Sequence, residues 1–400
     1  MVFVIEESFK GTLAAKGFEE QLMRLKPKPA MEEAPGQFWK DFIRDTAPEF
    51  RKSTIEQVET LIKPIWSELI DGSMYVNDRL AAIFQDVQPD VIVQDNVVAF
   101  PAVLTAGVPW VRIVSCNPLE VRDSALPPAF SGLPTGDSRD WDGFRRAYAE
   151  THAELHNAFG RFTSEQGCPP LPVGEFMYES PFLNLYNYPD ELDYRRSSPL
   201  NPTWQQLESC VRTTDAPFEL PLSVRGAGKL IYLSLGSLGS ADIELMGRLI
   251  DILGRTDHRI IVSMGPQLQE LRLHENMVGE EFLPQTSVLP LVDLVITHGG
   301  NNTVTECMYF GKPMIVLPLF WDQHDNAQRV HETGFGVRLN PYRFADEQLL
   351  GWIDRLSADA ELRDRLAGVA RRLQAAPGTI RAAERIESLT RSQSTIPASA

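Results

Sequence analysis

Hydrophobic residues in the second half of the chain come in short dense runs, separated by stretches in which they recur at helical spacing. Runs rich in Val, Leu and Ile predict buried strands near residues 230–235, 259–264, 291–297 and 314–319. Residues 242–253, between the first two runs, have the apolar spacing of an amphipathic helix. Strands that alternate with helices in this way favour an α/β fold built on a doubly wound parallel sheet.

The first half shows the same alternation, with apolar runs at residues 2–5, 89–95 and 107–114. Residues 117–181 then mix prolines with loop-borne aromatic side chains, which suits an apolar pocket, although many of these rings could serve ordinary packing. We therefore predict two Rossmann-like domains. Their predicted boundaries are a first domain at 1–214, a Pro- and Gly-containing linker at 215–228, a second domain at 229–390 and a flexible tail at 391–400.

Composition narrows the classes of partner. The chain has 400 residues, with 54 acidic against 38 basic side chains and a formal net charge of −16. This excess of acid disfavours nucleic acid and anionic membranes as partners. Four cysteines without a CxxC or zinc pattern indicate a reducing compartment, and the first residues lack the pattern of a signal peptide. Because charged residues, Pro and Gly interrupt the apolar segment 91–114, we expect a cytoplasmic protein without membrane insertion.

The candidate chemistry follows the predicted strand at 291–297. His298, Gly299 and Gly300 stand at its carboxyl end, where open α/β sheets bind ligands. A helix starting there, with Asn302 or Thr303 as N-cap, would direct free N–H groups and its positive dipole end at a diphosphate. A second interpretation is open at this point. Thr303 and Glu306 have the spacing of a capping box, in which Glu306 would serve only the helix itself.

Three further features allow two interpretations each. Ser237 lies in a Gly-rich turn after the strand at 230–235, which is either a phosphate contact or a plain strand-to-helix connection. Asp95 ends the strand at 89–95 and is either functional or the cap of the next helix. His152 and His156 have a spacing that could suit a metal, but without a third ligand we interpret them as a solvated helix face.

Four short motifs occur together in the second half. They are Phe282-Leu283-Pro284-Gln285, then His298 to Glu306, then Gly311-Lys312-Pro313-Met314, and finally Asp322 to Ala327. Their order resembles the signature of the UDP-glycosyltransferases, glycosyltransferase family 1, which have the GT-B fold. The resemblance extends to bacterial natural-product and macrolide-type enzymes.

This resemblance implies a role for each motif residue. The diphosphate would be held by Ser237, His298, Thr303 in place of the usual Ser, and the amides near Gly300 and Asn302. Gln285 would contact the nucleoside, Glu306 the ribose hydroxyls, and Asp322 with Gln323 the sugar. Phe282 stands where the family has Trp, so the base would stack on a smaller ring.

The resemblance also implies an activity. We expect an inverting glycosyltransferase that moves a hexose from a UDP- or dTDP-sugar to a hydroxyl group of a hydrophobic small molecule, with neither metal nor other cofactor. Two alternatives are a catalytically silent nucleotide-sugar-binding protein and a nucleotide-sugar epimerase of the same architecture. The Asp322-Gln323 pair argues against the epimerase.

Asp95 matches the carboxylate that orients a catalytic histidine in this family. The chain opens on what resembles the family's second strand, at residues 2–7, so we expect its first strand and the histidine-bearing loop to be absent. In a doubly wound sheet the first strand is central, and without it backbone groups on both neighbours lose their partners. We therefore expect these 400 residues alone to be inactive in transfer.

Overall fold

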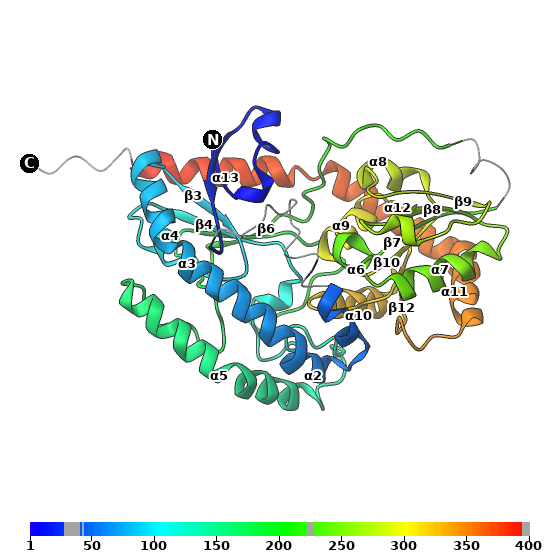
Figure 1. The fold of residues 1–400 in the computed structure, drawn as a ribbon, viewed down its shortest axis with the longest axis horizontal. Helices are drawn as coiled ribbons and strands as arrows, with labels where there is room; N and C mark the ends of the chain where they lie inside the picture. Colours follow the sequence, from blue (N-terminus) through cyan, green and yellow to red (C-terminus); the bar gives the residue numbers. More distant parts are fainter. Residues whose placement is uncertain (28–40, 42–43, 222–223, 225–227, 394–400) are drawn as a thin grey trace, which may run out of the picture.

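The computed structural model describes residues 1–27, 41, 44–221, 224 and 228–393. Parallel sheets form in both halves of the chain, and helices pack around them (Figure 1). The α/β fold class predicted from the alternation of apolar runs is confirmed. None of the helices within the described ranges is long and apolar enough to cross a membrane.

The second half contains a six-stranded parallel sheet in the order β12-β11-β10-β7-β8-β9. Its strands are β7 (Leu230–Ser234), β8 (Arg259–Ser263), β9 (Met277–Glu280), β10 (Leu294–Thr297), β11 (Met314–Val316) and β12 (Gly336–Arg338). Strands β7, β10 and β11 are buried along their whole length, as expected for a parallel sheet covered on both faces. The four strands predicted here are confirmed, although β10 begins at Leu294 because a 3-10 turn, Leu289–Leu291, precedes it.

Helices connect these strands. They are α6 (Gly236–Gly239), α7 (Ile243–Gly254), α8 (Gln285–Val288), α9 (Asn301–Tyr309), α10 (Gln323–Thr333), α11 (Asp346–Ala358) and α12 (Ala360–Ala375), with a 3-10 turn at Leu268–Glu270. Asp242 caps α7 by accepting a hydrogen bond from the Leu245 N–H group at 3.0 Å. The helix predicted at 242–253 is therefore confirmed, and the structure shows Asp242 as its N-cap.

The described part of the first half holds two separate sheets. One pairs β1 (Val2–Glu6) with β2 (Glu19–Met23), and the other has the order β3-β4-β5-β6. The strands of the second sheet are β3 (Ile92–Asp95), β4 (Trp110–Val114), β5 (Leu183–Tyr186) and β6 (Trp204–Gln206). All the pairings are parallel. The sequence predicted a first domain whose sheet lacks its first strand. The described residues of this half form two sheets, with no hydrogen-bonded ladder between them.

Two long helices, α3 and α5, pack on one another below the first-half sheets (Figure 1). The helices of this half are α2 (Thr54–Gln57), α3 (Lys63–Val87), α4 (Pro101–Leu104) and α5 (Trp141–Glu165), and a π turn at Val58–Ile62 joins α2 to α3. Short 3-10 turns occupy Glu7–Phe9, Ala14–Lys16, Ala47–Arg51 and Pro118–Glu120. Helix α13 (Gly378–Gln393) leaves the second half and packs on β5 (Figure 1).

Most aromatic side chains of residues 117–181 are packed in the core. Phe130, Trp141, Phe144, Tyr148 and Phe159 are all buried. The Phe130 ring also contacts Trp321 of the second half, with centroids 4.4 Å apart. Ordinary packing therefore accounts for much of the aromatic content of this segment.

The interpretation of His152 and His156 as a solvated helix face was wrong. His152 is 2% exposed, its Nδ1 atom lies 2.7 Å from the Tyr148 carbonyl oxygen, and its ring lies tilted against that tyrosine, with centroids 4.2 Å apart. His156 is half-buried, with Nε2 at 2.9 Å from the Pro172 carbonyl oxygen. The His152 hydrogen bond lies within α5, whereas the His156 bond connects α5 to the segment that follows it. Within the described ranges, no three His, Cys, Asp or Glu side chains are grouped as metal ligands.

Candidate functional site

His298 follows β10 directly, and its ring lies between two glycines from different loops. A Cβ atom added to Gly236 would be 2.7 Å from the His298 Cε1 atom, and one added to Gly300 would be 2.6 Å from Nε2. Gly236 follows β7, the strand beside β10, so neighbouring strand ends form this slot. Burial lowers the pKa of His298 to about 4. The imidazole is therefore neutral near pH 7 and carries one N–H group, and the ring has a hydrogen bond with the Ser234 backbone.

Helix α9 starts at Asn301 with Gly300 as its N-cap, and no side chain caps it. The N-cap predicted at Asn302 or Thr303 was wrong, because the chain turns earlier, at Gly299, whose φ of 88° only glycine adopts readily. Asn302 and Thr303 lie instead in the first turn of the helix. The free N–H groups of this turn and the positive end of the helix dipole could bind an anion beside His298.

Glu306 is not part of a capping box. Its Oε1 atom accepts a hydrogen bond from Arg212 Nη1 at 2.9 Å, and its Oε2 atom accepts one from Gln285 Nε2 at 2.5 Å. Gln285 Nε2 also donates to Thr303 Oγ1 at 3.2 Å. Burial raises the pKa of Glu306, and the hydrogen bond from Gln285 and the charge of Arg212 oppose this shift. The structure thus brings together Gln285, Thr303 and Glu306, and it adds Arg212, which the sequence did not suggest.

The remaining predicted nucleotide residues flank this group. Phe282 stands on the loop that leads into α8, and 57% of the residue is exposed. An exposed ring in this place offers a face on which a base could stack. Ser237 belongs to α6, immediately after Gly236, and its side chain lies outside the described residues.

Asp322 and Gln323 are buried at the start of α10 and already make hydrogen bonds within the protein. Gln323 Oε1 accepts from the N–H groups of Leu319 at 3.0 Å and Phe320 at 3.2 Å, which holds the preceding loop. Asp322 Oδ2 accepts from the Asn117 N–H group of the first half at 2.9 Å. Burial raises the pKa of Asp322 to about 7.

Asparagine side chains join the two halves around these residues. Asn301 Nδ2 donates to the carbonyl oxygens of Ser115 at 2.8 Å and Asn187 at 3.3 Å. Asn326 Nδ2 donates to the Gly299 carbonyl oxygen at 3.0 Å, while its Oδ1 atom accepts from Asn117 Nδ2 at 2.8 Å. Sequence reasoning missed Asn301, Asn326 and Asn117, because their partners are distant in the chain. Asn301 and Asn326 lie within the motifs at 298–306 and 322–327, which was the signal available for them.

Asp95 is the last residue of β3. Its carboxylate accepts a hydrogen bond from the Ser115 hydroxyl, and partial loss of solvent raises its pKa. The Ser115 carbonyl in turn accepts from Asn301, so Asp95 is connected to the start of α9 through one residue. Among the described residues, no histidine is recorded in contact with Asp95.

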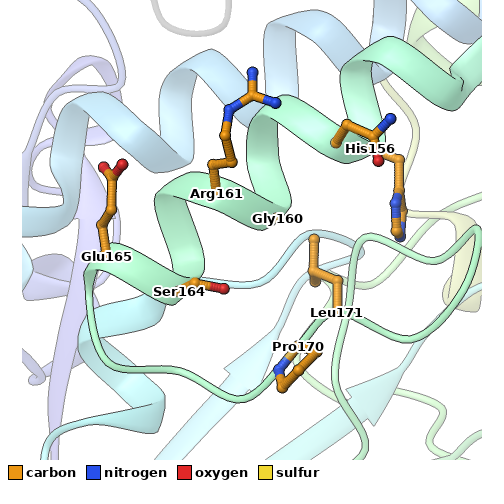
Figure 2. A pocket seen from close by; sticks show the side chains of 8 residues that line it. His156, Gly160, Arg161, Ser164, Glu165, Pro170 and Leu171 are labelled. Atoms are coloured by element: carbon orange, nitrogen blue, oxygen red, sulfur yellow. The ribbon is translucent and has the colours of Figure 1, made fainter.

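Two open hollows lie away from these residues. The larger, of ≈ 490 Å³, is formed by α5 with Pro170 and Leu171, and Figure 2 shows His156, Arg161 and Glu165 around it. The second, of ≈ 350 Å³, lies at the ends of β5 and β6 beside Tyr186 and Trp204. Neither is lined by any of the residues predicted for the donor site.

Known proteins resemble the chain in sequence. The profile of the UDP-glucoronosyl and UDP-glucosyl transferase family matches residues 185–366. NDP-glycosyltransferase YjiC of Bacillus subtilis (strain 168) is 31% identical over 171 residues, which are 42% of this chain and 43% of that protein. Zeaxanthin glucosyltransferase of Pantoea ananas is 26% identical over 326 residues, 77% of this chain and 74% of that protein. The match therefore spans less than half the length of the first curated relatives.

Solved structures resemble the chain over almost its whole length. The glycotransferase of kitacinnamycin superposes with a TM-score of 0.69 at 19% identity, covering 97% of this chain and 91% of that one. The glycosyltransferase VinC, solved in complex with dTDP, gives a TM-score of 0.62 at 18% identity, covering 98% and 92%. These likenesses show the fold, which is GT-B with two parallel-sheet Rossmann-like domains.

Proposed function

Because the chain belongs to the UDP-glycosyltransferase family, we propose that it transfers a hexose from a UDP- or dTDP-sugar to a hydroxyl group of an apolar small molecule. One observation carries the proposal. The neutral ring of His298 is held in a glycine slot beside the uncapped start of α9. Its single N–H group, which has the Ser234 backbone as a hydrogen-bond partner, and the α9 amides are the donors available to a diphosphate. The chain has a formal net charge of −16, so an anionic donor depends on such local donors.

We assign the donor to residues 229–390 and the acceptor to residues 1–214, with 215–228 as the connection. In this assignment the base stacks on Phe282, and Glu306 accepts from the ribose hydroxyls. The sugar lies towards Asp322 and Gln323, where a wrong epimer would leave buried polar groups unpaired. The diphosphate contacts are Ser237, His298, Thr303 and the amides near Gly300 and Asn302, and Gln285 contacts the nucleoside.

The proposed reaction is a single displacement. The acceptor oxygen forms a bond to the anomeric carbon while the bond from that carbon to the diphosphate oxygen breaks, and the configuration inverts. The electron pair leaves with the nucleoside diphosphate, whose growing charge His298 and the α9 amides stabilise. The acceptor hydroxyl gives up its proton to a base, and we assign to Asp95 the role of the carboxylate that orients this base.

A second candidate is a nucleotide-sugar-binding protein that does not catalyse transfer. It is favoured by the surroundings of Asp95, where Ser115 is the recorded hydrogen-bond partner and no histidine is in contact among the described residues. General-base help typically contributes about 10²- to 10⁴-fold in rate. The two candidates therefore share donor binding and differ in turnover.

Isothermal titration of the full chain with UDP and with dTDP, first in EDTA and then with added Mg²⁺, tests the proposal. We expect binding in EDTA. Lack of binding at millimolar nucleotide, or binding only with the cation, would overturn the assignment of the diphosphate to His298 and α9. Release of nucleoside diphosphate from a nucleotide sugar, measured with a panel of phenols and macrolides, then separates the two candidates.

A further inference from the structure

Arg212 enters the donor site from the segment between β6 and β7. Its Nη1 atom donates to Glu306 Oε1 at 2.9 Å, and its Nε atom donates to Asp215 Oδ1 at 2.7 Å. Asp215 Oδ2 in turn accepts from the Thr286 N–H group at 3.2 Å and from its hydroxyl at 2.9 Å. Asp215 is thereby tied to α8, and the Arg212 guanidinium is held between two carboxylates.

The two oxygens of Glu306 are engaged in the same way. Oε1 accepts one hydrogen bond from Arg212, and Oε2 accepts one from Gln285. Each carboxylate oxygen has two acceptor positions, so one position remains on each. A pair of free positions on adjacent oxygens matches the two neighbouring hydroxyl groups of ribose. A 2′-deoxyribose would fill only one of them.

We propose that Arg212 is a positioning residue of the donor site, which orients Glu306 to accept from both ribose hydroxyls and makes the site prefer a ribonucleoside diphosphate to its 2′-deoxy analogue. This inference rests on the proposed function, since it takes Glu306 as the ribose contact. It extends that proposal by naming a residue outside the family motifs and by choosing between two classes of donor.

Burial supports this role. The Glu306 side chain is 5% exposed, and an ionised carboxylate in such a place needs a paired charge. Arg212 provides that charge from the mouth of the site, where 47% of its side chain is exposed. It also separates Glu306 from Asp215, whose negative charge acts on Glu306. Without Arg212, Glu306 would keep only the contact with Gln285, and its second oxygen would lose its fixed direction.

Isothermal titration of the full chain with UDP and with 2′-deoxyuridine diphosphate tests the inference, because the two ligands differ only in the 2′-hydroxyl. The wild-type protein is expected to bind UDP about 10- to 100-fold more tightly, as for one hydrogen bond to a charged group. Arg212→Ala should bring this ratio down to about 3-fold or less, and Arg212→Lys should restore part of it. Arg272→Ala, which removes an exposed arginine from the same half, should leave the ratio unchanged.

The ratio separates positioning from mere support of the fold, because a structural defect would weaken both ligands equally. An unchanged ratio in Arg212→Ala, or equal affinity of the wild-type protein for both ligands, overturns the inference while leaving the proposed function in place. A wild-type protein that binds neither ligand overturns both. If Arg212→Ala does not fold, as judged by its thermal unfolding, Arg212→Gln carries the same comparison, since it removes the charge and keeps a donor.

Discussion

At the level of single residues, the imidazole of His298 fits where two backbones carry no side chain. Gly236 has φ of 72°, so its place in the slot requires glycine for conformation as well as for space. Gly300 has φ of −58°, which any residue can adopt, so only the contact with His298 excludes a side chain there. A substitution at Gly236 would therefore strain the backbone as well as contact His298, whereas one at Gly300 tests the contact with His298 alone.

Substitution of Gly300 by Ala should displace His298. The new Cβ atom would be 2.6 Å from Nε2, and the ring must move because the slot is closed by Gly236 on its other side. We expect a loss of about 1–3 kcal/mol in the free energy of unfolding, measured with urea. UDP affinity, measured by titration, should fall by about tenfold or more, as expected for a lost diphosphate contact.

Gly247→Ala is the matched control. Nothing lies within 4 Å of a Cβ atom at Gly247, which is inside α7. Stability should rise by up to about 1 kcal/mol, because Ala is the better helix former, and UDP affinity should not change. If Gly300→Ala bound UDP as tightly as the wild-type protein, His298 would not be a diphosphate contact.

At the level of elements, α13 connects the second half to the sheet of the first. Its Ala382, Ile386 and Leu389 side chains pack on a buried group from that sheet and the residues after it, formed by Val111, Leu183, Leu185 and Leu207. At Gly378, where the helix begins, an added Cβ atom would be 2.2 Å from the Ser209 carbonyl oxygen. A side chain at Gly378 would clash with the backbone of Ser209, so the start of α13 packs directly against that segment.

Truncation of one α13 side chain should therefore weaken the first half. Ile386→Ala removes partly buried methyl groups and should lower the free energy of unfolding by about 1–2 kcal/mol, which urea titration can measure. Ile380→Ala makes the same change in the same helix, where the residue is 60% exposed, and should alter stability by less than about 0.5 kcal/mol. Equal effects of the two substitutions would show that α13 does not stabilise the sheet by packing.

At the scale of the whole molecule, buried carboxylates of α10 hold the two halves together. Asp325 accepts from the N–H groups of Phe130 at 2.6 Å and Gly132 at 2.8 Å, while Asp322, just before the helix, accepts from Asn117. Burial raises the pKa of both Asp322 and Asp325 from 3.8 to about 7. A raised pKa means that the folded state binds the proton more tightly than the unfolded state does. The stabilisation is therefore fully present below pH 3.8 and is lost as the pH rises through about 7.

Asp325→Asn should remove this dependence, because the amide stays neutral. Relative to the wild-type protein, the variant should gain stability as the pH rises from about 4 to 7, by up to about 1.4 kcal/mol per pH unit. Urea unfolding at pH values across this range measures the difference, in which the contributions of groups that do not interact with Asp325 cancel. Asp364→Asn, exposed on α12, makes the same chemical change away from the contact between the halves and is the control variant. A constant difference for Asp325→Asn would contradict the buried-carboxylate account.

The sequence by itself determined the parts of the protein that depend on neighbours along the chain. Dense apolar runs identified β7, β8, β10 and β11, because a strand buried on both faces must be apolar throughout. The same runs placed His298 and its glycines at a strand end. The family resemblance grouped Gln285, Thr303 and Glu306, and these side chains do meet.

Tertiary structure decided what depends on distant partners. The short edge strands β9 and β12 have little apolar pattern of their own and were missed, since their neighbours in the sheet define them. Burial of His152 and the contact of Glu306 with Arg212 depend on segments far apart in the chain. A capping box and a solvated histidine pair were reasonable from local spacing alone. Local spacing does not indicate which distant side chain forms a hydrogen bond with a given residue. The tertiary packing of the chain determines that partner.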